Sequence, residues 1–186
     1  MALRSPQPAG EPPPPDKFSL AAVEIVPMRR RHIRAVLAIE QQVFPTPWSF
    51  GLYLSEVNQP SVRGYFVARY GATVVGYGGI MMAVDDAHVT TIAVDPGWQR
   101  LRIGRLILLH LARDARRRGA TDLTLEVRVS NVGAQALYYE FGFAPAGVRK
   151  NYYSEIREDA LIMWAHDIDG DEYEARLAAI ESRLAP

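Results

Sequence analysis

The chain has 186 residues, of which 48% are hydrophobic and 23% charged, a composition typical of a globular protein. Its 21 basic and 21 acidic residues give a formal net charge of zero, so neither nucleic acid nor an anionic membrane is an expected partner. The absence of cysteine excludes disulfides, thiolate catalysis and thiolate metal sites. No apolar run approaches the about 20 residues of a membrane span, and the N-terminus lacks the apolar core of a signal peptide. We therefore expect a soluble, cytoplasmic protein.

The chain is expected to have three parts. Residues 1–20 contain a run of prolines and predict a disordered arm. Residues 21–168 carry strand and helix patterns and predict one domain. Residues 169–186 have apolar residues at helical spacing and predict a C-terminal helical extension.

Strand and helix patterns alternate along the domain. Strands are predicted at 23–26, 65–70, 73–82, 87–94, 121–129, 143–148 and 159–166, and helices at 28–44, 49–57, 103–118 and 131–141. In the fifth strand, Leu123, Leu125, Val127 and Val129 alternate onto one face and leave Glu126 on the other. Helices between strands favour an α/β (α+β) fold, in which a mixed sheet of about seven strands has helices on both faces.

Several kinds of site are absent from the sequence. There is no Walker-type phosphate loop, no G-x-G-x-x-G and no G-x-S-x-G motif. The four histidines (His32, His88, His110 and His166) are scattered without the spacing of a metal-binding helix. We therefore interpret each histidine as structural and expect no metal.

One segment indicates an anion site. The strand at 91–94 is followed by the turn Asp95-Pro96-Gly97 and then by a helix start rich in arginine. Free N–H groups, the helix dipole and the guanidinium groups of Arg100, Arg102 and Arg105 would suit a pyrophosphate. Basic residues are also common at ordinary strand–helix turns, and Glu126 could simply be an exposed carboxylate paired with Arg128. From these residues alone, both interpretations stay open.

Two groups of motifs resemble those of known enzymes. The first group resembles the acetyl-CoA motif and the following segment of the GCN5-related N-acetyltransferases. It comprises Ile92-Ala93-Val94-Asp95-Pro96, Gln99-Arg100, Ile103-Gly104, Leu125-Glu126-Val127-Arg128, Ser130-Asn131, Ala136-Leu137-Tyr138 and Gly142-Phe143. The second group is similar to the RimI type, which acetylates the N-terminal alanine of a small-subunit ribosomal protein. It comprises Pro47-Trp48-Ser49, Arg149-Lys150-Asn151-Tyr152-Tyr153 and Glu158-Asp159-Ala160. The resemblance covers about residues 23–165.

The resemblance implies the acetyltransferase fold, acetyl-CoA as cosubstrate and the N-terminus of a ribosomal protein as partner. It assigns Glu126 as general base and Tyr138 as general acid. A carboxylate can take a proton from an α-amine of pKa ~7.7–8.0, and a tyrosine hydroxyl can protonate a departing thiolate. The remaining implied contacts are Ile92, Ala93 and Val94 to the pantetheine arm, Arg100, Leu101, Arg102, Ile103, Gly104 and Arg105 to the pyrophosphate, Asn131 to the CoA chain, and Trp48, Tyr152 and Tyr153 to the acceptor peptide.

One position departs from the family pattern, because Arg102 stands where glycine is usual. If its φ is positive, the arginine carries strain of order 1 kcal/mol, but its guanidinium could also pair with phosphate. Three alternatives to the RimI-type activity remain from the sequence. They are an acetyltransferase for a small-molecule amine, a catalytically silent acetyl-CoA-binding module and, least favoured, nucleic-acid binding through the arginine clusters at 29–31 and 116–118.

Overall fold

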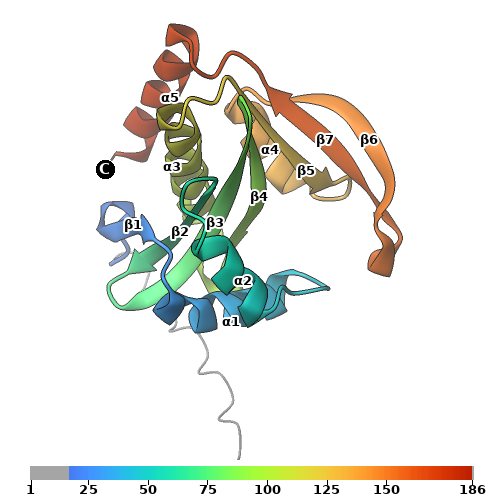
Figure 1. Cartoon of the computed structure of the whole chain (residues 1–186). Coiled ribbons are helices and arrows are strands. Elements are labelled where there is room, and N and C mark those ends of the chain that lie inside the picture. Colours follow the sequence, from blue (N-terminus) through green and yellow to red (C-terminus); the bar gives the residue numbers. More distant parts are fainter. Residues whose placement is uncertain (1–16, 186) are drawn as a thin grey trace, which may run out of the picture.

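The computed structural model describes residues 17–185 and shows one mixed sheet with helices on both faces (Figure 1). The predicted arm lies outside the described residues except for its last four positions. The seven strands are arranged in the order β1-β2-β3-β4-β5-β7-β6, and only β4 and β5 run parallel. Their bounds are β1 Val23–Pro27, β2 Arg63–Tyr70, β3 Thr73–Ala83, β4 Asp86–Val94, β5 Asp122–Arg128, β6 Ala144–Tyr153 and β7 Glu158–Ala165.

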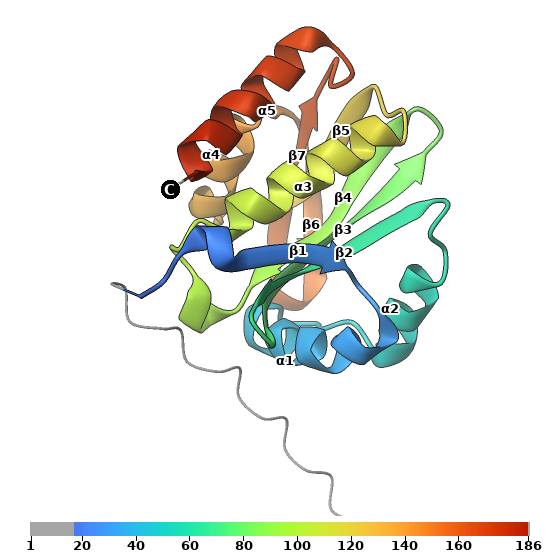
Figure 2. The same cartoon turned by 90° about the vertical axis from the view of Figure 1, so that its left-hand side faces the viewer.

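The α-helices divide between the two faces of the sheet, because apolar side chains on each face need cover. One core holds buried side chains of α1 and α2 against β2 and β3. The larger core holds those of α3, α4 and α5, and Figure 2 shows α3 and α5 together on this face. The bounds are α1 Ile33–Val43, α2 Phe50–Val57, α3 Ile103–Arg117, α4 Val132–Glu140 and α5 Asp171–Leu184. No helix within residues 17–185 is long and apolar enough to cross a membrane.

Helix α3 lies directly on β3 because the strand carries glycines beneath it. A Cβ atom on Gly78 would lie 2.8 Å from Ile107 Cγ2 and 3.0 Å from Leu111 Cδ1. The first distance is shorter than real Cβ contacts and the second is tighter than nine in ten of them, so a larger residue would force these side chains or the helix to shift. The close approach fixes the start of α3 beside the end of β4.

The sheet is split between β4 and β5. Their parallel ladder has only three residue pairs and ends where His88 faces Thr124. On its other side, β4 pairs with β3, and a register shift leaves Thr90 without a partner there. A bulge bends its strand and interrupts pairing, so β4 turns away from β5 immediately after His88. One edge of β4 is left open from this point to Val94.

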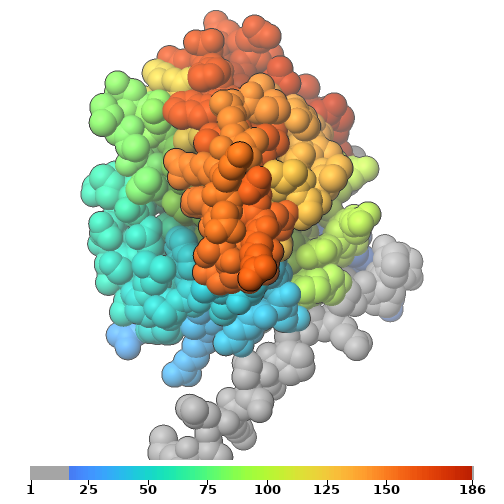
Figure 3. Space-filling view, turned by 90° about the vertical axis from the view of Figure 1, so that its right-hand side faces the viewer, coloured from blue at the N-terminus to red at the C-terminus, as the bar shows by residue number. Residues whose placement is uncertain are grey.

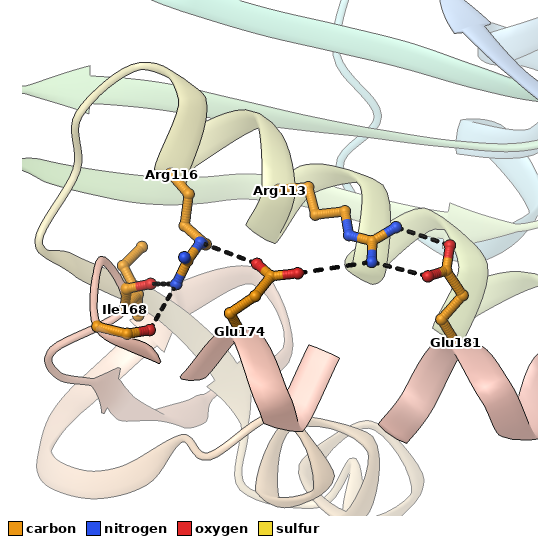
Figure 4. A network of polar contacts seen from close by, with 6 residues as sticks. Arg113, Arg116, Ile168, Glu174 and Glu181 are labelled. Atoms are coloured by element: carbon orange, nitrogen blue, oxygen red, sulfur yellow. Dashed lines mark hydrogen bonds and ion pairs between the residues drawn. The ribbon is translucent and has the colours of Figure 1, made fainter. Parts of the chain in front are cut away.

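Helix α5, the predicted extension, packs on α3. Its side chains Tyr173, Leu177 and Ile180 are buried in the larger core. Arginines of α3 also reach acidic groups of α5 (Figure 4). Arg113 forms a bidentate contact with Glu181 at 2.7 and 2.8 Å, and Arg116 Nε lies 3.4 Å from Glu174.

The predicted order of elements is the observed order, with three local differences. The sixth strand is predicted to end at 148, but β6 continues to Tyr153, because Arg149 and Tyr153 pair with Ala160 and Glu158 of β7 on either side of an irregular stretch. The first helix begins only at Ile33, after a 3-10 turn at Arg30–His32. Val129 was expected on the buried face of the fifth strand, and it is exposed instead, since the chain turns after Arg128 to begin α4.

Candidate active site

A cavity of about 290 Å³ lies where β4 and β5 part. Its walls come from five regions: the open part of β4, the facing part of β5, the end of α1 with the segment after it, α4 with its N-cap, and the β6–β7 hairpin. Figure 3 shows this hairpin, in orange, reaching toward the blue and cyan surface of the α1–α2 region. The cavity lining includes Glu126, Tyr138, Asn131, Ile92, Trp48, Tyr152 and Tyr153 among the residues that the sequence singled out.

Glu126 is held by two basic side chains. Its Oε2 lies 3.0 Å from His88 Nε2, and its Oε1 lies 3.1 Å from Arg149 Nη1. Only 10% of its side chain is exposed. The hydrogen bond from His88 is the main cause that holds the pKa of Glu126 below its usual range, against the effect of burial. The charge of Arg149 adds to it, and so does the charge of His88 when that imidazole is protonated. Glu126 is therefore an ionised, oriented carboxylate. Its partners are His88 and Arg149, and not the Arg128 of the alternative interpretation as an exposed carboxylate.

Tyr138 lies on α4 and is 9% exposed. Its ring packs on Phe143, with the ring centroids 5.7 Å apart, and it also borders the cavity. Burial raises the pKa of Tyr138 well above its usual range. Its hydroxyl is therefore protonated at neutral pH, which is the form that a proton donor needs.

The turn before α3 has an unusual backbone. Arg100 and Arg102 both have positive φ, at 66° and 63°, in the left-handed region that non-glycine residues rarely adopt. Because the φ of Arg102 is positive, this residue carries the backbone strain expected from the sequence in that case. Its guanidinium Nη1 donates to the carbonyl of Arg183, near the end of α5, at 3.0 Å.

The helix start also has the features of an anion site. The first N–H groups of a helix have no carbonyl partner one turn earlier, and here they belong to Ile103, Gly104 and Arg105. A Cβ on Gly104 would meet Leu137 and Val94 only at 3.7 and 3.8 Å, so packing within the protein does not require glycine there. Among the other predicted contacts, Leu101 precedes this start, and Ala93 pairs with Tyr77 of β3.

Asn131 caps α4 at the rim of the cavity. Its Oδ1 accepts a hydrogen bond from Ala134 N at 3.1 Å, as expected for an N-cap residue. The amide N–H₂ group of the same side chain remains as a donor for a ligand.

The predicted acceptor walls face each other across the cavity. Trp48 packs on Tyr53, with ring centroids 5.2 Å apart, so it has a packing role and also lines the cavity. Tyr152 and Tyr153 come from the end of β6, and the Arg149 guanidinium carbon lies 5.6 Å from the centre of the Tyr152 ring. Burial is the main cause that raises the pKa of Tyr153 to about 12. Tyr152 adds to this rise, and the carboxylate of Glu126 adds a smaller contribution.

Sequence reasoning missed three residues of this site. His88 was interpreted as structural, and Arg149 was only part of a matching motif. Glu40, on α1, lines the cavity while only 2% exposed, and it accepts a hydrogen bond from the Tyr53 hydroxyl. Burial raises the pKa of Glu40. A polar residue inside an apolar helical stripe was the available signal for Glu40, whereas the position of His88 depends on strand register.

The chain is similar to known acetyltransferases in sequence and in fold. The model described as the acetyltransferase (GNAT) family matches residues 33–143. The [ribosomal protein bS18]-alanine N-acetyltransferase of Escherichia coli K12 is 39% identical over 131 residues, which cover 69% of this chain and 87% of the relative. The N-alpha-acetyltransferase RimI of Mycobacterium tuberculosis is 36% identical over 147 residues, covering 76% and 90%. The crystal structure of the Escherichia coli ribosomal-protein-S18-alanine N-acetyltransferase superposes with a TM-score of 0.71 at 35% identity, covering 78% of this chain and 94% of that one.

Proposed function

This chain belongs to the acetyltransferase (GNAT) family, and we propose that it transfers acetyl from acetyl-CoA to the N-terminal alanine of ribosomal protein bS18. The observation that carries the proposal is the convergence of Glu126 and Tyr138 on one cavity beside the open edge of β4. The named activity of relatives that are 36–39% identical to this chain supports the choice of acceptor.

The residues around the split sheet fit an extended thioester cosubstrate. Over Ile92, Ala93 and Val94, the edge of β4 that faces away from β3 has no strand partner within the described part of the chain, so backbone groups there can bond the amides of a pantetheine arm. The Val94 carbonyl on this segment also accepts a hydrogen bond from Gln99 Nε2 at 3.3 Å. The N–H groups at the start of α3 and the arginines of the preceding turn suit the pyrophosphate. The Asn131 amide lies at the rim, where it can donate to the same chain.

The acceptor peptide would enter between Trp48 on one side and Tyr152 and Tyr153 on the other. Aromatic walls with hydroxyl groups suit an extended peptide end. At pH 7, about a tenth of an α-amine of pKa ~7.7–8.0 is already neutral. The neutral nitrogen attacks the thioester carbonyl directly, forming the amide bond while the carbon–sulfur bond breaks.

Two side chains handle the protons of this step. Glu126 accepts the proton that the nitrogen loses as the amide forms, directly or through one water. Tyr138 donates its proton to the departing sulfur, which yields the free thiol, and recovers a proton from solvent afterwards. Each group is in the required form at neutral pH, since the pKa of Glu126 is lowered and that of Tyr138 is raised.

Mass spectrometry with two peptides tests the proposal. One peptide has the bS18 N-terminal sequence with a free alanine, and the other has a blocked N-terminus and an internal lysine. Acetylation of the first peptide alone is the expected result. Modification of small amines and of neither peptide would make the protein a small-molecule acetyltransferase. Acetyl-CoA binding without any transfer would identify a silent binding module.

A further inference from the structure

His88 occupies the point where the sheet opens. It is the last residue of β4 that pairs with β5, where it faces Thr124. Glu126 follows Thr124 by two positions, so the two side chains lie on the same face of β5. The Nε2 atom of His88 lies 3.0 Å from Glu126 Oε2. The imidazole therefore bridges the two strands at the place where backbone pairing stops.

Arg149, on β6, is the second basic partner of Glu126. It reaches the second carboxylate oxygen at 3.1 Å, and its own side chain is 55% exposed. The carboxylate thus has one nitrogen partner on β4 and one on β6. Because the side chain is only 10% exposed, water competes weakly with either partner. The orientation of Glu126 toward the cavity depends on these two contacts.

The two partners differ in how they respond to pH. Arginine keeps its charge at every pH at which the protein is folded, whereas histidine changes charge between about pH 5 and 8. A neutral imidazole can donate an Nε2–H bond to Glu126 and hold it in place. An imidazolium makes the same bond and adds a second full positive charge beside a carboxylate that must accept a proton.

We propose that His88 is a positioning residue for Glu126, and that Glu126 serves as the base only while His88 is neutral. This inference rests on the proposed transfer to an amine and adds a proton-controlled element to it. In the neutral state, Glu126 carries one fixed counter-charge, from Arg149, and takes the proton of the attacking nitrogen. In the protonated state, Glu126 is neutralised by two cations and does not take it.

Other charged and titratable groups near this point do not replace His88 in that role. On β5 the next charged residue is Arg128. On β6, burial is the main cause that raises the pKa of Tyr153, and Glu126 also raises this pKa whereas Arg128 lowers it. Behind β4, Glu56 of α2 and Thr90 both bond the hydroxyl of Tyr65, and Arg63 of β2 pairs with Glu56 at 2.8 Å. Of the groups named here, His88 is the one histidine, and its Nε2 contacts Glu126 at 3.0 Å.

The pH dependence of kcat/KM for the peptide tests the inference, with acetyl-CoA saturating. If only the free amine of the peptide ionises, a plot of log kcat/KM against pH has a slope of one below about pH 7.5. A requirement for neutral His88 adds a second proton, so the slope of the wild type should approach two at the acid end of the profile. In His88→Asn, which keeps an N–H donor but does not titrate, the slope should stay at one. Its kcat at pH 8 should fall by about three- to tenfold because the donor is displaced.

Two further variants serve as controls. Arg149→Met should lower the rate at every pH and retain the slope of two, because arginine does not titrate in this range. His166→Asn changes a histidine that is 66% exposed and pairs with Asp122, and its profile should match the wild type. Thermal unfolding of each variant shows that it is folded.

A slope of one in the wild type, or a slope of two in His88→Asn, would overturn the inference. These outcomes are separate from failure of the proposed function, in which the alanyl peptide is not acetylated at all. If a small amine is the true acceptor, the same comparison of slopes with that amine tests His88.

Discussion

Substitutions of Arg102 test two properties of the turn before α3: the cost of its left-handed backbone conformation and its contribution to acetyl-CoA binding. The residue has φ 63°, stands where the motif resemblance leads us to expect glycine, and precedes α3 directly. We compare Arg102→Ala, which removes the guanidinium but keeps a Cβ atom, with Arg102→Gly, which also removes the Cβ atom. The difference between the two variants isolates the backbone effect, and the loss common to both isolates the guanidinium.

The expected stability difference follows from two opposing contributions. A left-handed conformation costs a residue with a Cβ atom about 1–2 kcal/mol, and glycine avoids that cost. Glycine in turn loses about 0.4–1 kcal/mol more than alanine through the entropy of its unfolded chain. Arg102→Gly should therefore be more stable than Arg102→Ala by about 0.5–1 kcal/mol. For a chain of this size, that corresponds to a Tm higher by about 1–4 °C.

The expected affinity difference follows from the donors of the guanidinium. Arginine has five N–H groups, and the bond to the Arg183 carbonyl uses one nitrogen, so the side chain can hold α5 and a phosphate at once. At an exposed site we expect a phosphate contact of about 1 kcal/mol, since salt screens it. Both variants should then bind acetyl-CoA about fivefold more weakly.

Calorimetry with two ligands measures this loss. Acetyl-pantetheine lacks the pyrophosphate, so its Kd should be unchanged in both variants while that of acetyl-CoA rises. Equal losses for the two ligands would show that Arg102 does not act on the phosphates. A Tm for Arg102→Gly below that of Arg102→Ala would refute the argument from φ.

Three further variants probe the catalytic groups and the packing of α3. Glu126→Gln should lower kcat by about 10²–10⁴-fold, as expected for loss of a general base. Its acetyl-CoA Kd, measured by calorimetry, should stay within twofold of wild type. An unchanged single-turnover rate would exclude Glu126 as the base. Tyr138→Phe should also lower kcat in a pH-rate profile, and because burial raises the pKa of Tyr138, the wild type should show no loss of rate from this hydroxyl up to about pH 9. Gly78→Ala should destabilise the fold by about 1–3 kcal/mol through overpacking against Ile107, measured by urea unfolding, and a neutral result would mean that α3 moves away freely.

The sequence predicts the elements of this fold well because their signals are local. The helix predicted at 103–118 is α3, Ile103–Arg117, followed by Gly119 with φ 88°. Alternation of Leu123, Leu125 and Val127 correctly predicts the buried face of β5. Such patterns record which side of one element meets apolar neighbours.

What the sequence does not predict is the pairing between distant strands. The role of His88 depends on its register with Thr124, and the extension of β6 beyond 148 depends on the two pairs that Arg149 and Tyr153 make with β7. Neither relation leaves a mark in the residues nearby. The catalytic assignments themselves came from motif resemblance, since an acidic residue on a strand has many ordinary explanations.

The short ladder between β4 and β5 has a mechanical consequence. Strands joined by a full ladder resist sliding, because any slip breaks the whole register of hydrogen bonds. Across this seam only three residue pairs exist, and the two halves of the sheet are otherwise joined by side chains packed beneath α3 and α4. Packed side chains permit small shear displacements that ladders do not. The distance between the two halves of the sheet can therefore adjust by small displacements while the ladders within each half stay intact.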